Sequence, residues 1–154
     1  MRVNAAIAHD MMERVERFYR HVDLVVGAQN DIDGAEMHTS LTCLYTAGSD
    51  CFFAHVGHSR ASLLRHGRLV QMTRDQTVEA DALAGDAPMV PPSAHDLQHV
   101  LIDVIGGPPG SLRVDVEHIA LADRDVLLLC TNGLTDVVSD QTIQAVLEQQ
   151  AAPD

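Results

Sequence analysis

Residues 126–136 have the sequence VLLLCTNGLTD, an apolar run followed at once by a polar turn. Consecutive apolar residues of this kind are typical of a strand that is covered on both faces in a layered fold. Asn132-Gly133 ends the run, and Ser139 is a candidate N-cap for a helix over residues 140–149. This stretch therefore predicts a strand, a turn and a helix at the end of the chain.

Working outward from this stretch, the rest of the chain alternates between helical and strand patterns. Apolar residues recur at three- and four-residue steps over residues 9–29, which predicts a helix with one apolar stripe. Short β-rich runs separated by turn residues follow. We expect strands at 41–46, 51–56, 60–65, 69–73 and 112–121, a loop at 76–94 with a helical turn at 78–83, and a short helix at 97–104. These elements predict one α+β domain over residues 1–154, with helices layered on an antiparallel sheet or sandwich.

The composition of the chain excludes some classes of partner. The formal net charge is −12, and all ten basic residues are arginine. An acidic surface repels nucleic acid and anionic membranes, so we expect neither as a partner. Cys43, Cys51 and Cys130 are an odd number without metal-binding spacing, so we expect buried, reduced thiols in a cytoplasmic protein. The N-terminus does not have the pattern of a secretory signal, and no apolar run is long enough to cross a membrane.

Four stretches carry a resemblance to a known family. They resemble, in order and approximate spacing, the "GTT", "NVGDSRA", "DGKLxQLTxDH" and "LLLCSDGLTD" motifs of bacterial type 2C, metal-dependent serine/threonine phosphatases. The similarity extends from about Met11 to Leu147. The matching stretches are MHTSL at residues 37–41, AHVGHSRA at 54–61, HGRLVQMTRD at 66–75 and VLLLCTNGLTD at 126–136.

This resemblance implies a β-sandwich flanked by helices, with an active site at one end. In the family, a hydroxide that bridges two manganese or magnesium ions attacks phosphoserine or phosphothreonine. Hard cations need carboxylate oxygens, and two close ions activate a bridging water and neutralise the phosphoryl oxygens. We therefore expect Mn²⁺ or Mg²⁺ by resemblance, unless the site has lost its metals.

The chain departs from the family at its metal ligands. The elements that bear the first metal cluster would precede residue 1, and a last aspartate would follow Asp154, so we expect a truncated and degenerate domain. The "DSR" aspartate is His58 here, the "SDG" aspartate is Asn132, and the "DH" histidine is Gln76. We assign no catalytic residue, and we take Asn132, His58 and Asp136 as candidate ligands of a degenerate metal site.

The scaffold positions of the motifs are retained. Thr39, Gly57, Ser59, Arg60 and Gly133 match the family's pattern. We expect both glycines at turns that a Cβ would strain. Arg60 is expected to pair with a carboxylate inside the fold, with a phosphate contact as the alternative.

Two other constellations stay open at this point. His55 and His58 could meet across a bend at Gly57, and His38 could join them in a zinc site; scattered or hydrogen-bonded histidines are the alternative. Asp136 could lend a carboxylate to a cation or cap the turn that it follows.

Three functions follow from these observations. The first is a phosphatase scaffold with impaired or lost catalysis, acting as a regulatory module that binds a phosphoprotein or a regulatory protein. The second is an active, divergent Mg²⁺- or Mn²⁺-dependent protein phosphatase. The third is a non-functional, truncated domain. Strands missing from the sheet would leave an exposed edge, which predicts a homodimer or a heteromeric complex.

Overall fold

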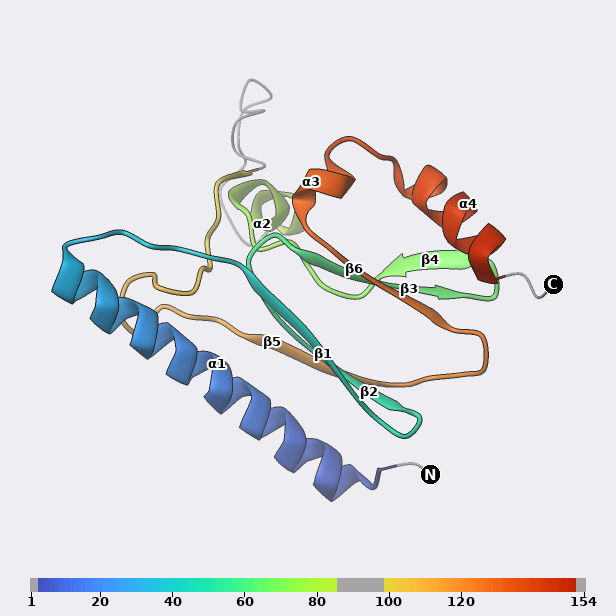
Figure 1. Cartoon of the computed structure of the whole chain (residues 1–154), viewed down its shortest axis with the longest axis horizontal. Helices are drawn as coiled ribbons and strands as arrows, with labels where there is room; N and C mark the ends of the chain where they lie inside the picture. The colour runs from blue at the N-terminus through green and yellow to red at the C-terminus, as the bar shows by residue number, and fades with distance from the viewer. Residues whose placement is uncertain (1–2, 86–98, 152–154) are drawn as a thin grey trace.

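The computed structural model describes residues 3–85 and 99–151, which form two antiparallel sheets with helices on their outer faces (Figure 1). The first sheet has the order β1-β2-β5, formed by Leu41–Ala47, Asp50–Val56 and Asp115–Ala120. The second has the order β4-β3-β6, formed by Arg68–Gln71, Arg60–Arg65 and Val126–Cys130. Helix α1 (Ala5–Asp33) packs on the first sheet and α4 (Asp140–Ala151) on the second. The predicted α+β class with an antiparallel sandwich is confirmed.

Helix α1 is longer than the predicted residues 9–29. The side chain of Asn4 caps its N-terminus by accepting a hydrogen bond of 2.9 Å from the backbone N–H of Ile7. Gly34, at φ 62°, ends the helix in the left-handed conformation. The apolar stripe predicted from the sequence faces the sheet, and at its centre Tyr19 is completely buried.

Tyr19 ties α1 to the first sheet. Its hydroxyl donates a hydrogen bond of 2.7 Å to the carbonyl of Ala54 on β2. Burial raises the pKa of this phenol above its ordinary value, so the group remains a donor. Every residue of β2 is buried, because this strand lies between β1 and β5 and is covered by α1 on one face. A second core, built around Cys51, Phe53 and Ala61, fills the space between the two sheets.

Strand β6 corrects one prediction. Its five apolar residues predicted a strand covered on both faces, but β6 lies at an edge of its sheet. Its residues are half-buried, and Leu129 is 48% exposed. An apolar run cannot distinguish a central strand from an edge strand whose outer side is open.

The prediction of a short helix at 97–104 is also corrected. Residues 99–104 form no α-helix; Leu101 instead makes an isolated bridge with Thr77, and the N–H of Ile102 donates to the carbonyl of Gln76. The extended chain satisfies its backbone groups against the residues that precede α2 (Val78–Ala84), which confirms the predicted helical turn at 78–83. Residues 86–98, which include the second part of the predicted loop at 76–94, lie outside the described part of the chain.

Three smaller outcomes complete the fold. Strand β4 ends earlier and β5 begins later than predicted, at Gln71 and Asp115. Of the free cysteines, Cys51 is buried, and burial raises its pKa to about 11; Cys43 and Cys130 are only half-buried, so their predicted burial is wrong. No helix within residues 3–85 and 99–151 combines the length and apolarity needed to span a bilayer.

Candidate functional site

Helix α2 and the short helix α3 (Asn132–Thr135) lie near each other at one end of the sandwich (Figure 1). A pocket of about 380 Å³ is lined there by residues of α2, α3 and the start of β3. We call it the motif pocket, because three of the four sequence motifs contribute to its wall. Polar and charged side chains dominate it. The lining residues are His58, Arg60, Asp75, Thr77, Glu79, Ala80, Leu83, Thr135 and Asp136.

The structure brings the three candidate ligands to this one place. His58 and Asp136 both line the motif pocket. Asn132 reaches it through Asp136, since its Nδ2 donates a hydrogen bond of 3.0 Å to Asp136 Oδ2. Residues from the second and fourth motifs therefore meet in space. The same hydrogen bond holds Asp136 at the turn after β6, so the capping role also has a structural basis.

Asp75 is the carboxylate with the most contacts in the pocket. Arg60 Nε donates to both its oxygens, at 2.9 and 3.1 Å, and Arg60 Nη2 lies 2.5 Å from Oδ2. Hydrogen bonding to Asp75 raises the pKa of the Arg60 guanidinium, so the guanidinium is permanently charged. His58 Nε2 lies 3.3 Å from the same Oδ2. The prediction that Arg60 pairs with a carboxylate inside the fold is confirmed, and Asp75 is largely neutralised.

Sequence reasoning assigned no role to His99, which lies beside the pocket. Its Nδ1 is 4.0 Å from Asp136 Oδ2, and its ring centroid is 5.9 Å from that of His58. No sequence signal indicated this proximity, because His99 lies far from both His58 and Asp136 in the sequence. Two imidazoles and one carboxylate thus lie close together, although they come from three separate segments.

The sequence also did not reveal that Gln76 links several segments of the fold. It is completely buried; its Oε1 accepts a hydrogen bond of 2.7 Å from the N–H of Gly57, and its Nε2 donates to Asp115 Oδ2 at 3.0 Å. It stands where the resemblance places a histidine. Its amide both donates and accepts at fixed positions, so it holds the turn between β2 and β3 to the start of β5.

The retained scaffold residues act in different ways. Gly57 has φ 102°, and an added Cβ would collide with the side chain of Ser40, so the prediction for this glycine is confirmed. The prediction that a Cβ would strain the turn at Gly133 is wrong. The φ of Gly133 lies outside the positive range, and a Cβ would make only an ordinary contact of 3.5 Å with Thr131. Thr39 bridges to Ile105, and the Ser59 carbonyl accepts a hydrogen bond of 3.2 Å from a threonine on β1.

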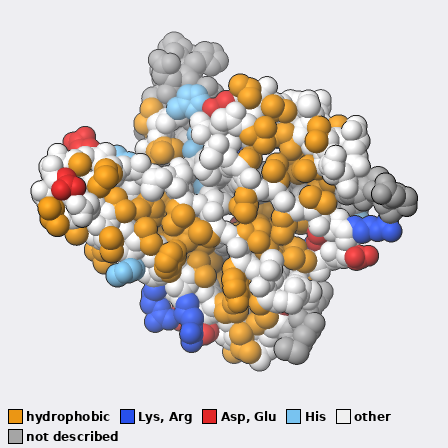
Figure 2. All heavy atoms as spheres, in the orientation of Figure 1, with side chains coloured by type: hydrophobic (Ala, Val, Ile, Leu, Met, Phe, Trp, Pro, Cys, Tyr) orange, Lys and Arg blue, Asp and Glu red, His pale blue; other side chains and the backbone are white. Residues whose placement is uncertain are grey.

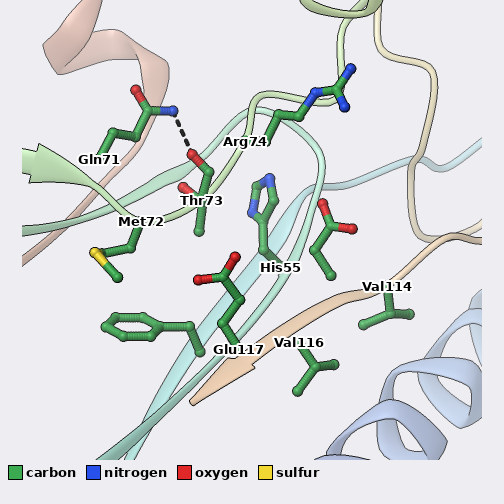
Figure 3. A pocket seen from close by; sticks show the side chains of 10 residues that line it. His55, Gln71, Met72, Thr73, Arg74, Val114, Val116 and Glu117 are labelled. Atoms are coloured by element: carbon green, nitrogen blue, oxygen red, sulfur yellow. Dashed lines mark hydrogen bonds between the residues drawn. The ribbon is translucent and has the colours of Figure 1, made fainter. Parts of the chain in front are cut away.

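A second cavity, of about 370 Å³, opens between β5 and the segment after β4 (Figure 3). His55 lies at its centre, but both ring nitrogens have partners: Thr42 Oγ1 at 2.8 Å and the Gly57 carbonyl at 3.0 Å. Burial lowers the pKa of His55, so the ring is neutral. His55 is therefore occupied in holding the strands together, and the zinc site with His38 and His58 does not form.

Comparisons with known proteins agree with the motifs. No protein-family model matches the chain. Over 160 residues it is 31% identical to the serine/threonine protein phosphatase PstP of Mycobacterium tuberculosis, a match covering 95% of this chain and 30% of the relative. The solved catalytic domain of PstP in complex with two manganese ions superposes with a TM-score of 0.66 at 28% identity, covering 85% of this chain and 54% of that domain. The chain is a bacterial type 2C phosphatase-like protein.

The fold match is broader than the sequence match. The S. agalactiae serine/threonine phosphatase superposes with a TM-score of 0.78 over 96% of this chain and 60% of its own, at 23% identity. The type 2C phosphatase-like chain thus spans little more than half of the solved domains and about a third of PstP. The incomplete sandwich predicted from the sequence is confirmed.

The motif pocket of this type 2C phosphatase-like chain fits a pair of Mn²⁺ or Mg²⁺ ions poorly. Both ions are hard cations that bind several carboxylate oxygens. Asp75 is neutralised by Arg60, Asn132 contributes no charge, and Asp136 already accepts a hydrogen bond. Within the described ranges, no group of three His, Cys, Asp or Glu side chains is arranged to hold a metal ion. We therefore derive no hydrolytic step through a metal pair from these residues.

Proposed function

We propose that this type 2C phosphatase-like chain is a binding module that has lost the hydrolytic chemistry of its relatives. The observation that carries the proposal is that Asn132 and His58 stand at two positions where the resemblance places metal-binding aspartates, and that no three His, Cys, Asp or Glu side chains of the described ranges are arranged to hold a metal ion. Asp75, the carboxylate with the most contacts in the pocket, does not replace them, because it is paired with Arg60, whose Nη2 lies 2.5 Å from Asp75 Oδ2. A metal ion would have to compete with a guanidinium that is held at several points.

Charge supports the same conclusion. Two dications carry a charge of +4, and the pocket's other carboxylates are Glu79 and Asp136. Each carboxylate missing from such a site leaves more of the cations' charge uncompensated in a partly buried place. Asn132 and His58 replace two aspartates of the family pattern. Negative charge is therefore missing at two positions where the family's carboxylates bind metal ions.

The partner would be a protein, either a phosphoprotein or a regulatory protein. The net charge of −12 favours a partner with a basic surface over nucleic acid or an anionic membrane. The three free thiols suit the reducing cytoplasm, where we place the module.

One observation favours an alternative, an active and divergent phosphatase. The ring centroids of His58 and His99 lie 5.9 Å apart, and His99 Nδ1 lies 4.0 Å from Asp136 Oδ2, so two imidazoles and a carboxylate are near one another. Such a set would hold one divalent ion, with nitrogen donors in place of most of the family's oxygens.

The test is hydrolysis of p-nitrophenyl phosphate with Mn²⁺, with Mg²⁺ and with EDTA. We compare the native chain with the double variant Asn132→Ala, Asp136→Ala, and use Asp123→Ala, an exposed carboxylate elsewhere, as the matched control. The proposal expects no metal-dependent turnover above that of the double variant. Turnover that requires Mn²⁺, persists in Asp123→Ala and is lost in the double variant would establish the active alternative instead.

A further inference from the structure

The positive charge of the motif pocket is already compensated within the protein. Arg60 donates to Asp75 from both Nε and Nη2. The side-chain amide of Asn132 is also in use, since its Nδ2 donates to Asp136 Oδ2 at 3.0 Å. A bound phosphate group needs charged or amide donors of this kind. The pocket is therefore poorly equipped to hold an anion.

The negative charge of the pocket is not compensated in the same way. Glu79 lines it and pairs with no cation of the described residues. Asp136 accepts a hydrogen bond from a neutral amide and lies 4.0 Å from His99 Nδ1. Figure 2 shows histidine and acidic side chains next to each other near the end of the molecule at which α2 and α3 lie in Figure 1, while the arginines seen in this view lie elsewhere. The pocket thus has an excess of negative charge.

His58 adds an acceptor that the fold does not use. The residue is 9% exposed and lines the pocket. Its Nε2 faces Asp75 Oδ2 at 3.3 Å, so the proton of the neutral ring belongs on Nε2, and Nδ1 is an acceptor. Nδ1 has no hydrogen-bond partner within residues 3–85 and 99–151, and no side-chain nitrogen there is both fully enclosed and unpaired. Nδ1 therefore reaches the open space of the pocket, where a donor of a ligand can meet it.

One wall of the pocket is apolar. Ala80 and Leu83 line it from α2, and Leu83 is 84% exposed. Long basic side chains bury their methylene stem along apolar surface while the charged head makes polar contacts. The volume of about 380 Å³ lies within the range of about 300–1,000 Å³ that is usual for ligand pockets. The pocket therefore offers a surface for each part of a basic side chain.

We propose that the motif pocket binds an arginine side chain of a partner protein, whose guanidinium donates to Asp136, Glu79 and His58 Nδ1. The stem of this arginine packs on Leu83. A guanidinium is a planar cation with N–H donors and no acceptor, so it complements a pocket whose unused groups are acceptors. The net charge of −12 attracts a partner with a basic surface.

This inference rests on the proposed function, since it takes the pocket to be a binding site. Of the two kinds of partner considered there, it selects a regulatory protein that presents a basic residue. It excludes the phosphate group of a phosphoprotein as the ligand of this pocket, because Arg60 is held by Asp75 and the remaining carboxylates would repel an anion.

The test is a ¹H–¹⁵N NMR titration of the full chain in EDTA with N-acetyl-arginine amide, N-acetyl-citrulline amide and O-phosphoserine. Citrulline has nearly the shape of arginine without its charge, and EDTA keeps metal-dependent hydrolysis out of the measurement. Glu79→Gln and Asp136→Asn each remove one negative charge from the pocket. Asp123→Asn removes the same charge at an exposed position outside it and is the matched control.

We expect the arginine probe to shift the amide signals of residues 58, 75–80 and 132–136, with a Kd of the order of 1 mM. Glu79→Gln and Asp136→Asn should each weaken binding by about fivefold, which is the upper range for one exposed ion pair. Asp123→Asn should leave the affinity unchanged. The citrulline and phosphoserine probes should leave these signals where they are.

Four results would overturn the inference. They are the absence of shifts at about 50 mM arginine probe, an equal response to citrulline, equal weakening by Asp123→Asn, and phosphoserine shifts at the same residues. The p-nitrophenyl phosphate assay separates this failure from a failure of the proposed function. Metal-dependent turnover would reject the binding module, whereas the absence of both turnover and arginine binding would reject only the arginine site.

Discussion

Removing the carboxylate of Asp75 should destabilise the fold, because that group compensates a partly buried guanidinium. The side chains of Arg60 and Asp75 are 22% and 14% exposed, and Arg60 donates from both Nε and Nη2. Breaking a fully buried ion pair costs about 3–5 kcal/mol. Since this pair retains some contact with water, we expect about 3 kcal/mol for Asp75→Ala, or a melting temperature lower by about 6–12 °C.

Urea denaturation followed by circular dichroism measures this loss. Asp10→Ala is the control, because its ion pair with Arg14 lies on the exposed face of α1 and should contribute less than about 1 kcal/mol. In the double variant Arg60→Met, Asp75→Leu, much of the stability should return, since no unpaired charge remains. If Asp75→Ala unfolds within about 0.5 kcal/mol of the native chain, the carboxylate of Asp75 does not compensate the Arg60 guanidinium and the argument is refuted.

Three further predictions concern the framework of the pocket. Tyr19→Phe should cost about 1–3 kcal/mol in urea denaturation, because the buried carbonyl of Ala54 loses its donor; an unchanged midpoint would contradict this. Burial lowers the pKa of His55, so below about pH 6.5 the unfolded chain binds a proton at this ring that the native chain does not bind. The free energy of unfolding should therefore fall as the pH drops below about 6.5. His55→Asn should reduce this dependence of stability on pH. Gly57→Ala should cost more than about 2 kcal/mol in thermal unfolding, since the Cβ collides with Ser40; a loss below 0.5 kcal/mol would contradict the strain argument.

Much of the fold could be predicted from periodicity. The stripe in α1 and the short apolar runs of β1 to β6 fix the order of elements, because helices and strands impose different spacings on the residues that face a core. The helix at 97–104 was wrong because its apolar spacing is also compatible with an extended chain. There, a hydrogen bond from the N–H of Ile102 to the carbonyl of Gln76 and a bridge between Leu101 and Thr77 decide the conformation.

Some residues of the candidate site could likewise be predicted from the sequence and others could not. His58, Asn132 and Asp136 could be identified because they stand within motifs of recognisable sequence, and the structure places them together. His99 and Gln76 could not, because their roles depend on contacts between segments distant in sequence. The edge position of β6 was hidden for a similar reason: strand order is a property of the sheet, not of the five residues VLLLC.

The most direct test of the central claim is a count of bound manganese ions by electron paramagnetic resonance, in the native chain and in Asp136→Ala. Free Mn²⁺ gives a strong signal in solution, so the loss of signal as the protein is titrated measures binding. A scaffold without the two-metal centre predicts fewer than two ions per chain at about 100 µM Mn²⁺, with little difference between the two proteins. Two bound ions per chain, lost in Asp136→Ala, would show that the metal pair survives and would contradict the claim.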